Sequence, residues 1–198
     1  MRSLFPLFLK LEGRRCLVVG AAEIGEPKIA GLLGTAGIVD VVAPHATEKV
    51  AEWAQERKIH WFKRKFHDSD LDGCLLVIVA TSSRELQERI HRLARRRGVL
   101  CNVVDVPELC DFYYPAVVKR GALQIAISTG GESPALAHRL RKELEAQFGP
   151  EYEDWLAELG EARKRIREEV VEAADQKAKL HESASAASFQ QFLKRRKK

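Results

Sequence analysis

The stretch Cys16-Leu-Val-Val-Gly-Ala-Ala-Glu-Ile-Gly25 decides the fold of this chain. A short apolar run typical of a β-strand leads into a glycine turn, and a helical pattern follows through about Leu33. The first glycine can take a tight turn, the last lets the helix pack close to the strand, and the N–H groups between them suit a pyrophosphate. The stretch therefore predicts a dinucleotide-binding turn. Its candidate contact residues are Gly20, Ala22, Glu23, Ile24 and Gly25.

Strands and helices alternate downstream of this turn. The expected strands are 38–43, 59–62, 75–80 and 99–104, and the expected helices are 46–57 and 83–97. Pro44 is expected to end the strand at 38–43. The runs at 75–80 and 99–104 are mainly apolar throughout, which is typical of strands buried on both faces. This order predicts an α/β fold with a Rossmann-like, doubly wound parallel sheet, whose ligands lie at the carboxyl ends of the strands.

The sequence pattern changes after Pro115. Residues 116–121 and 123–128 predict a hairpin-like pair of strands. Ser133-Pro134 then predicts the start of a helix, because serine caps helices well and proline suits the first turn.

This helix is expected to end near Phe148, where Gly149-Pro150 follows. From Glu151 onward the chain is expected to be helical and heavily charged, with a break in the Ser/Ala-rich stretch 181–188. We therefore expect three regions. They are a Rossmann-like nucleotide-binding domain (1–113), a small α+β dimerisation or substrate module (114–149) and a helical C-terminal region with a basic tail (150–198).

The composition is that of a soluble globular protein, since 45% of the 198 residues are apolar and 31% are charged. No apolar run approaches the ~20 residues that a membrane helix needs. The N-terminal Met1-Arg-Ser-Leu-Phe-Pro6 lacks the long apolar region of a signal peptide. We therefore expect a cytoplasmic protein without a membrane partner.

Part of the net charge of +5 lies at the C-terminus, in Lys194-Arg-Arg-Lys-Lys198. A basic tail can bind nucleic acid. No interleaved aromatic residues or reading helix accompany this one, so a solvated tail is favoured and nucleic acid is not expected as a partner. The cysteines lack metal-type or redox-type pair spacing and predict buried, reduced thiols; they are Cys16, Cys74, Cys101 and Cys110. The histidines likewise lack ligand spacing, so no preformed metal site is expected.

Asp105 is the candidate general base. It follows the strand at 99–104, at the crevice edge where a doubly wound fold places its ligands. A carboxylate there can accept a proton from a substrate. A structural role is the alternative, because aspartate often begins a turn and Pro107 follows closely.

Ser128-Thr-Gly-Gly131 predicts a second anion site. Two hydroxyls and free N–H groups stand ahead of a helix N-terminus, which favours a carboxylate or phosphate. Simple capping is the alternative, with Ser133 as the N-cap of the helix.

Three blocks, together with the turn at 16–25, point to one family. They are Asn102-Val-Val-Asp105, Cys110-Asp-Phe-Tyr-Tyr-Pro115 and Ser128-Thr-Gly-Gly-Glu-Ser-Pro134. From Phe5 to about Phe148 the chain resembles the precorrin-2 dehydrogenase/sirohydrochlorin ferrochelatase family, whose enzymes finish siroheme. The resemblance implies NAD-dependent oxidation of precorrin-2 to sirohydrochlorin. It also allows a second activity that takes Fe²⁺ as co-substrate and inserts it into sirohydrochlorin.

The resemblance further implies a homodimer in which the 114–149 module exchanges elements between subunits. The methyltransferase domain that is fused to some relatives is absent here, so a separate enzyme is expected to supply precorrin-2. Asp105 matches the family's catalytic aspartate. The residues expected to bind the tetrapyrrole substrate are Asn102, Ser128, Thr129, Gly130 and Gly131. For Asn102, orientation of the backbone is the alternative. Cofactor contacts outside the turn are expected at Pro44, His45 and Thr81.

The glycine turn departs from the family's usual pattern. Ala21 and Ala22 add methyl groups where the cofactor is expected to approach most closely. Glu23 and Glu26 add negative charge to the first turn of the helix, and Pro27 stands where relatives carry arginine. These differences predict weakened NAD affinity.

Asp40 follows Gly20 at the spacing of a ribose-binding acid but lies in the middle of a strand, so a structural role is favoured. Three other functions stay open: a nucleotide- or tetrapyrrole-binding protein without turnover, a chelatase alone, and a redox-sensing regulator whose basic tail touches nucleic acid.

Overall fold

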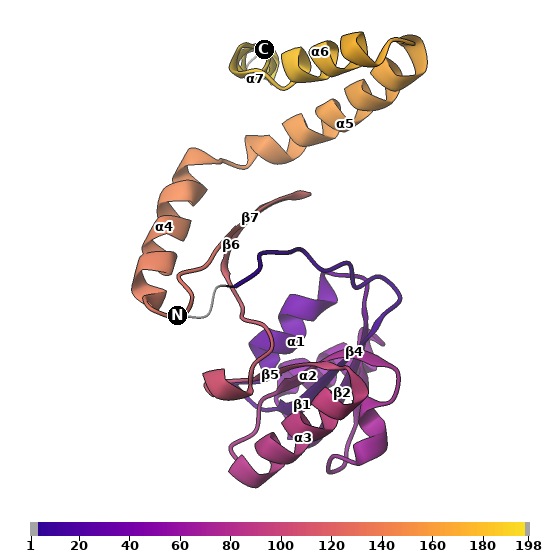
Figure 1. Ribbon diagram of the computed structural model, residues 1–198, viewed down its shortest axis with the longest axis vertical. Coiled ribbons are helices and arrows are strands. Elements are labelled where there is room, and N and C mark those ends of the chain that lie inside the picture. The colour runs from indigo at the N-terminus through magenta and orange to yellow at the C-terminus, as the bar shows by residue number, and fades with distance from the viewer. Residues whose placement is uncertain (1–3, 197–198) are drawn as a thin grey trace. The chain divides into compact units, whose positions relative to one another are not determined.

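A computed structural model describes residues 4–196 of the chain (Figure 1). The chain divides into two compact units. The N-terminal unit is Phe5–Tyr113, and the C-terminal unit begins at Tyr114 and also includes Leu4. Lys197 and Lys198 of the expected basic tail lie outside the described residues.

The N-terminal unit is built on a five-stranded parallel sheet with strand order β3-β2-β1-β4-β5. Its strands are β1 (Arg15–Ala21), β2 (Ile38–Ala46), β3 (His60–Phe62), β4 (Cys74–Val79) and β5 (Leu100–Val103). Its helices are α1 (Glu26–Leu33), α2 (Glu48–Gln55) and α3 (Arg84–Arg97), with short 3-10 turns at Asp68–Leu71 and Pro107–Leu109. This confirms the expected Rossmann-like fold.

The two faces of the sheet carry two separate layers of buried side chains. On one face, Leu17 and Val19 of β1 share a cluster with Ile90 of α3. On the other face, Cys16 and Val18 share a cluster with side chains of α1 and α2. Successive residues of a strand point to opposite faces, so a strand covered on both sides must be apolar throughout. Val77 and Val79 of β4 lie in the first cluster and Leu76 and Ile78 in the second, which confirms that the strand expected at 75–80 is buried on both faces.

The second strand does not end at Pro44, contrary to expectation. β2 pairs with β1 at Val19↔Val42 and again at Ala21↔Ala46, so three residues of β2 lie opposite one residue of β1. Proline is tolerated in such a bulge because its missing N–H takes no part in the ladder there. The strand therefore continues to Ala46 past an exposed Pro44.

The C-terminal unit begins with a two-stranded antiparallel sheet of β6 (Ala116–Arg120) and β7 (Leu123–Ile127). Val118 of β6 is fully buried, and α4 (Pro134–Gln147) packs against both strands. Ser133 caps α4 as expected, because its hydroxyl accepts a hydrogen bond from the N–H of Leu136 at 3.2 Å.

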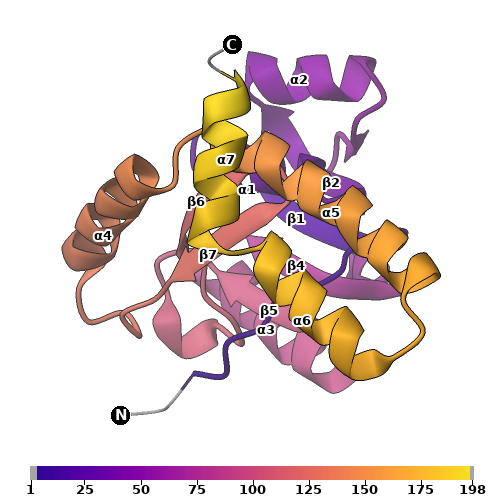
Figure 2. The same ribbon diagram turned by 90° about the horizontal axis from the view of Figure 1, so that it is seen from above.

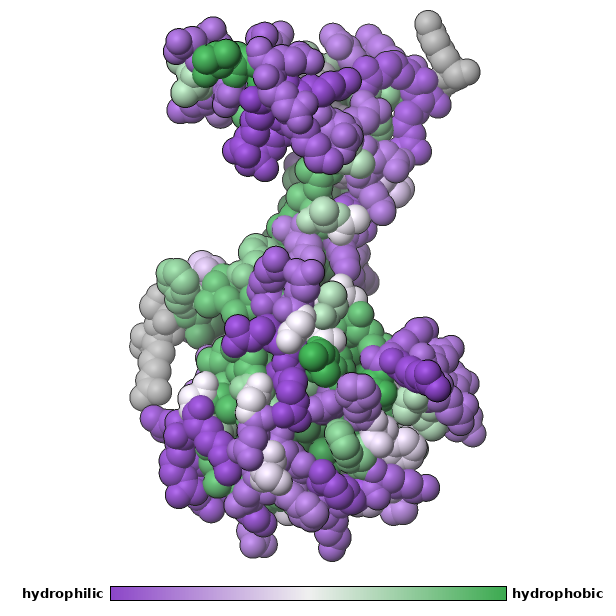
Figure 3. All heavy atoms as spheres, turned by 90° about the vertical axis from the view of Figure 1, so that its right-hand side faces the viewer, coloured by the Kyte–Doolittle hydropathy of each residue, from purple (hydrophilic) through white to green (hydrophobic). Residues whose placement is uncertain are grey.

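Three charged helices complete this unit: α5 (Glu151–Glu169), α6 (Ala173–Ser183) and α7 (Ala186–Arg196) (Figure 2). Their outer surface is predominantly hydrophilic in the upper part of Figure 3. Trp155 of α5 packs against Tyr152 of the same helix and against Phe189 of α7. The break near 181–188 is present, but a second break at 170–172 was not expected from the sequence. Among the described residues, no helix is both long and apolar enough to cross a membrane.

Candidate active site

The glycine turn between β1 and α1 has the geometry of a nucleotide-binding turn. Gly20 has φ +103°, and a Cβ placed on it would lie 2.1 Å from the carbonyl oxygen of Ala80. A Cβ on Gly25 would lie 2.2 Å from the carbonyl oxygen of Gly20. Both positions therefore require glycine, Gly20 for its conformation and for space, and Gly25 for space alone.

The backbone of this turn offers donors to an anion. The N–H groups of Gly25 and Glu26 are used within the turn, because both donate to the carbonyl oxygen of Ala22, at 2.8 and 3.0 Å. Among residues 4–196, no hydrogen-bond partner occurs for the N–H groups of Ala22, Glu23 and Ile24. All three residues are exposed ahead of the N-terminus of α1. Free donors at a positive helix end suit a pyrophosphate, so the residues present fit a dinucleotide cofactor.

Two of the expected obstacles to cofactor binding, Ala21 and Glu26, make contacts with other parts of the N-terminal unit. Ala21 is only 1% exposed and belongs to the core, so its methyl group does not face a cofactor. The carboxylate of Glu26 accepts a hydrogen bond from the hydroxyl of Thr47 at 2.6 Å. Ala22 and Glu23 stay exposed in the turn and remain the departures that bear on affinity.

The other expected cofactor contacts lie along the same edge of the sheet. Pro44 and His45 are exposed in the bulge of β2. Thr81 follows β4; its hydroxyl accepts a weak hydrogen bond from the N–H of Ser83 at 3.4 Å, and its carbonyl oxygen accepts one from Gln87 Nε2 at 2.6 Å. Because the carboxyl ends of adjacent parallel strands meet at one edge, these residues lie on the same side as the glycine turn.

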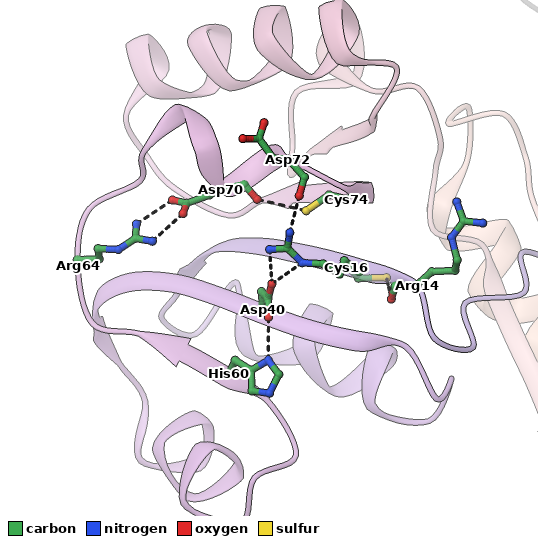
Figure 4. A network of polar contacts seen from close by, with 9 residues as sticks. Arg14, Cys16, Asp40, His60, Arg64, Asp70, Asp72 and Cys74 are labelled. Carbon is green, nitrogen blue, oxygen red and sulfur yellow. Dashed lines mark hydrogen bonds and ion pairs between the residues drawn. The ribbon is translucent and has the colours of Figure 1, made fainter.

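Asp40 has a structural role instead of binding ribose. It is buried in the middle of β2, where its carboxylate contacts Arg15 Nη2 at 2.6 Å. The same carboxylate contacts His60 Nδ1 at 3.0 Å (Figure 4). The contacts join β1, β2 and β3. A carboxylate engaged in this way inside the sheet is unavailable to a ligand at the sheet edge.

Asp105 is exposed at the carboxyl end of β5. It has φ +62°, a left-handed conformation that few residues other than glycine adopt, although aspartate tolerates it better than most. A hydrogen bond from the N–H of Val106 to the carbonyl oxygen of Val103, 3.1 Å long, closes the turn around it. Within the described part of the chain, the Asp105 carboxylate has no hydrogen-bond or ion-pair partner. It is therefore free to accept a proton.

Asn102 is placed differently from a substrate-binding residue. It is 6% exposed, and its Nδ2 donates to the carbonyl oxygen of Phe112 at 2.7 Å and contacts Cys110 Sγ at 3.5 Å. Its amide group thus binds the chain that follows Asp105. This contact was not predicted from the sequence. The polar residues Cys110 and Asp111, which follow the end of the strand closely, were the available signal for it.

The Ser128–Gly131 loop lies in the C-terminal unit. Gly130 and Gly131 have φ of +64° and +89°, so the loop contains two consecutive left-handed residues. The hydroxyls of Ser128 and Thr129 accept hydrogen bonds from the N–H groups of Gly130 and Ser133, both at 3.2 Å. Each hydroxyl keeps its own O–H donor, so capping and anion binding are compatible here.

Arg120, one of the basic side chains close to this loop in sequence, is already engaged within the C-terminal unit. Its guanidinium donates to the carbonyl oxygens of Phe148 at 2.8 Å and Glu145 at 3.0 Å, and so caps the end of α4. The sequence did not indicate this contact because the partners are distant along the chain.

The cysteines are free thiols, and three of them are buried as expected. Burial raises the pKa of Cys101 to about 12 and that of Cys16 to about 11, so both stay protonated near neutral pH. No group of three or more potential metal-ligating side chains occurs among residues 4–196.

Two family models match this chain. The model described as "Putative NAD(P)-binding" matches residues 7–116, and that for the sirohaem biosynthesis protein central region matches residues 120–147. The chain belongs to the family of NAD(P)-binding proteins that the first model describes. Among curated proteins, the siroheme synthase of Nitrosococcus oceani is 38% identical over 83% of this chain, and that of Pseudomonas entomophila is 40% identical over 83%. The chain spans about a third of the length of these curated relatives, 34% and 35%.

A solved structure matches nearly all of this chain. The structure of SirC, a precorrin-2 dehydrogenase, superposes with a TM-score of 0.78 at 26% identity. The match covers 97% of this chain and 98% of that chain. The helical region after the Rossmann-like unit therefore belongs to the shared architecture.

Proposed function

We propose that this chain is an NAD-dependent dehydrogenase that oxidises precorrin-2 to sirohydrochlorin in siroheme biosynthesis. The observation that carries the proposal is Asp105, an exposed and unpaired carboxylate held in a left-handed turn at the same sheet edge as a nucleotide-binding turn. The SirC match over nearly the full length of both chains supports it.

The residues of the N-terminal unit have separable tasks in this proposal. Gly20 and Gly25 give the turn its shape by allowing close backbone contacts within the unit, and the N–H groups of Ala22, Glu23 and Ile24 donate to the pyrophosphate of the cofactor. Pro44, His45 and Thr81 border the same edge and contact the rest of the cofactor. Bound NAD supplies the hydride acceptor for the oxidation. The carboxylate of Asp105 accepts the proton that precorrin-2 loses in the same reaction.

The tetrapyrrole carries many carboxylates, so its recognition needs hydrogen-bond donors. The hydroxyls of Ser128 and Thr129 and the N–H of Gly131 supply them from the loop ahead of α4. Asn102 contributes indirectly, by binding the backbone beyond Asp105.

The proposal includes a homodimer in the cytoplasm. The β6–β7 sheet has two strands, so each strand has an outer edge without a pairing neighbour among the described residues of the C-terminal unit. Unpaired edges favour cover by another segment, and a second copy of the chain supplies one.

A second candidate function is chelation with Fe²⁺ as substrate. Metal insertion requires two pyrrole N–H protons to leave, and the free Asp105 carboxylate suits that step as well as the oxidation. Binding without turnover is the third candidate, and the exposed methyl group of Ala22 in the turn is the observation that favours it.

The test is anaerobic turnover of precorrin-2 with NAD⁺, followed spectroscopically, for the wild type and Asp105→Ala. Loss of a general base is expected to lower kcat by roughly 10²- to 10⁴-fold. Asp175→Ala, which removes another exposed carboxylate, is the matched control and is expected to retain full activity.

Metal insertion is assayed separately with sirohydrochlorin and Fe²⁺. A folded wild type that inserts iron but does not oxidise precorrin-2 would exclude the dehydrogenase and support the chelatase as the function. A folded wild type with neither activity would leave the binding protein.

A further inference from the structure

The loop that carries Asp105 is closed at its base by a reciprocal pair of hydrogen bonds. The N–H of Cys101 donates to Asp111 Oδ2 at 2.9 Å, and the N–H of Asp111 donates to the carbonyl oxygen of Cys101 at 2.7 Å. β5 is the edge strand of the sheet and pairs only with β4 within the N-terminal unit. Asp111 therefore occupies the outer edge of β5, where a further strand would otherwise bind.

Cys110 lies inside this closed loop and contacts both sides of the Asp105 turn. Its Sγ is 3.1 Å from the carbonyl oxygen of Val103 and 3.3 Å from that of Val106, the residues at the two ends of the turn. A thiol S–H can donate to these oxygens, whereas a thiolate would be repelled by them. Burial raises the pKa of Cys110, so the thiol keeps its proton.

Asn102 joins the two parts of the arrangement. Its Nδ2 reaches both Cys110 Sγ and the carbonyl oxygen of Phe112. Val106 and Leu109 also pack against the core cluster beneath α3, which anchors the loop from its other side. The Asp105 carboxylate itself takes no part in any of these contacts within the described residues.

We propose that Asn102, Cys110 and Asp111 form a latch that holds the Asp105 turn in its left-handed conformation and so positions the Asp105 carboxylate for proton transfer. The inference rests on the proposed function, in which Asp105 is the base. The latch residues are positioning residues, because their side chains contact the backbone of the loop and not the carboxylate. A left-handed turn at a non-glycine residue persists only where its surroundings hold it, and the latch supplies that hold.

The first test compares Cys110→Ala with Cys110→Ser in precorrin-2 oxidation. The alanine variant loses the S–H donor and is expected to lower kcat by about 10- to 100-fold, the loss typical of a catalytic group displaced by about 1 Å. The KM for NAD⁺ is expected to stay within about twofold, because the turn at Gly20 is separate from the latch. Cys110→Ser keeps a donor and is expected to recover most of the rate.

The matched control is Cys74→Ala. Cys74 is a buried thiol of the same unit that also contacts a carbonyl oxygen, that of Asp70 at 3.2 Å, but it lies at the start of β4, whereas Cys110 is half-buried in the loop after β5. This variant is expected to keep the wild-type kcat. An equal loss of kcat in Cys74→Ala and Cys110→Ala would overturn the latch, since loss of any thiol that contacts a carbonyl oxygen would then explain both.

The second test asks whether the latch acts through Asp105. In an Asp105→Ala background, Cys110→Ala is expected to cause no further loss of kcat, because residues that act as one unit are not additive. A full additional loss would overturn the proposal.

Hydrogen exchange gives a readout that does not need activity. The amide protons of Cys101 and Val106, which donate within the loop, are expected to exchange at least about 10-fold faster in Cys110→Ala and Asp111→Ala than in the wild type. Unchanged exchange would overturn the latch even if the enzyme is active. If the wild type does not oxidise precorrin-2, the proposed function is wrong, and the latch then has no catalytic role even where the exchange result supports its structure.

Discussion

Replacing Gly20 with alanine tests the geometry of the nucleotide turn directly. The new Cβ would lie 2.1 Å from the carbonyl oxygen of Ala80, whereas real Cβ atoms stay at least 3.0 Å from such an atom. The carboxyl end of β4 must therefore move by roughly 0.9 Å, the difference between these two distances. This movement strains the hydrogen bond from the N–H of Ala80 to the carbonyl oxygen of Val19, which is 2.7 Å long.

The cost has two parts. Alanine at φ +103° is strained by about 1–3 kcal/mol. Loss of the backbone hydrogen bond adds about 0.5–1.5 kcal/mol. We therefore expect Gly20→Ala to lower the free energy of unfolding of the N-terminal unit by about 1.5–4.5 kcal/mol. We also expect weaker NAD binding, because the overlap with Ala80 displaces the turn whose N–H groups face the cofactor.

Gly98→Ala is the matched control in the same unit. Gly98 ends α3 with φ +67°, but no atom lies within 4 Å of a Cβ placed there. Alanine at this position carries the conformational strain without the steric overlap. We expect a loss of about 1–2 kcal/mol and unchanged NAD affinity.

The assay is urea denaturation followed by tryptophan fluorescence in a Trp155→Phe background. The signal then comes from Trp53 and Trp61, which both lie in the N-terminal unit. Equal losses of stability in Gly20→Ala and Gly98→Ala would refute the reasoning, because the close approach to Ala80 would then carry no energy.

Three further predictions concern charge and the turn. Ala22→Gly is expected to raise NAD affinity several-fold in a calorimetric titration, and an unchanged affinity would show that the methyl group does not restrict the cofactor. Thr47→Val frees the Glu26 carboxylate and is expected to lower NAD affinity at low salt, while Glu26→Gln in that background restores it; no rescue would contradict this explanation. Burial raises the pKa of Asp70, but the hydrogen bonds from Arg64 and from the N–H of His67, together with the charge of Arg64, outweigh this and hold the pKa below its usual value. The ionised Asp70 therefore stabilises the fold above about pH 4, and this stability is lost as the pH falls through the lowered pKa, so acid unfolding of Asp70→Asn should show a shallower pH dependence.

Local sequence patterns predicted most elements of the fold. The apolar run at 75–80 predicted β4, and the amphipathic segment at 83–97 predicted α3, each within one or two residues. A strand buried on both faces is apolar throughout, whereas a helix buried on one face has apolar residues at a helical period. The prediction that Pro44 ends the strand was wrong. A proline ends a strand only where its missing N–H would have paired, and at the bulge opposite β1 no such pairing is needed. The break at 170–172 has no strong local signal such as glycine or proline.

The candidate site was predicted in part. The glycine turn and Asp105 could be placed by their position at strand ends. The direction of a side chain could not, so the methyl group of Ala21 was assigned to the cofactor when it lies in the core. For Asn102 the sequence left contact with the substrate and orientation of the backbone as alternatives, and its Nδ2 binds the carbonyl oxygen of Phe112.

The sequence by itself determined the order of strands and helices, the turn that begins at Gly20 and the carboxylate at the end of β5, because these depend on residues close together in the chain. Only the tertiary structure decided that Gly20 faces the carbonyl oxygen of Ala80, that Arg120 caps α4 and that Cys110 and Asp111 hold the Asp105 turn. Such contacts join atoms from separate segments. Their geometry depends on how those segments pack together, and no local period or propensity encodes it.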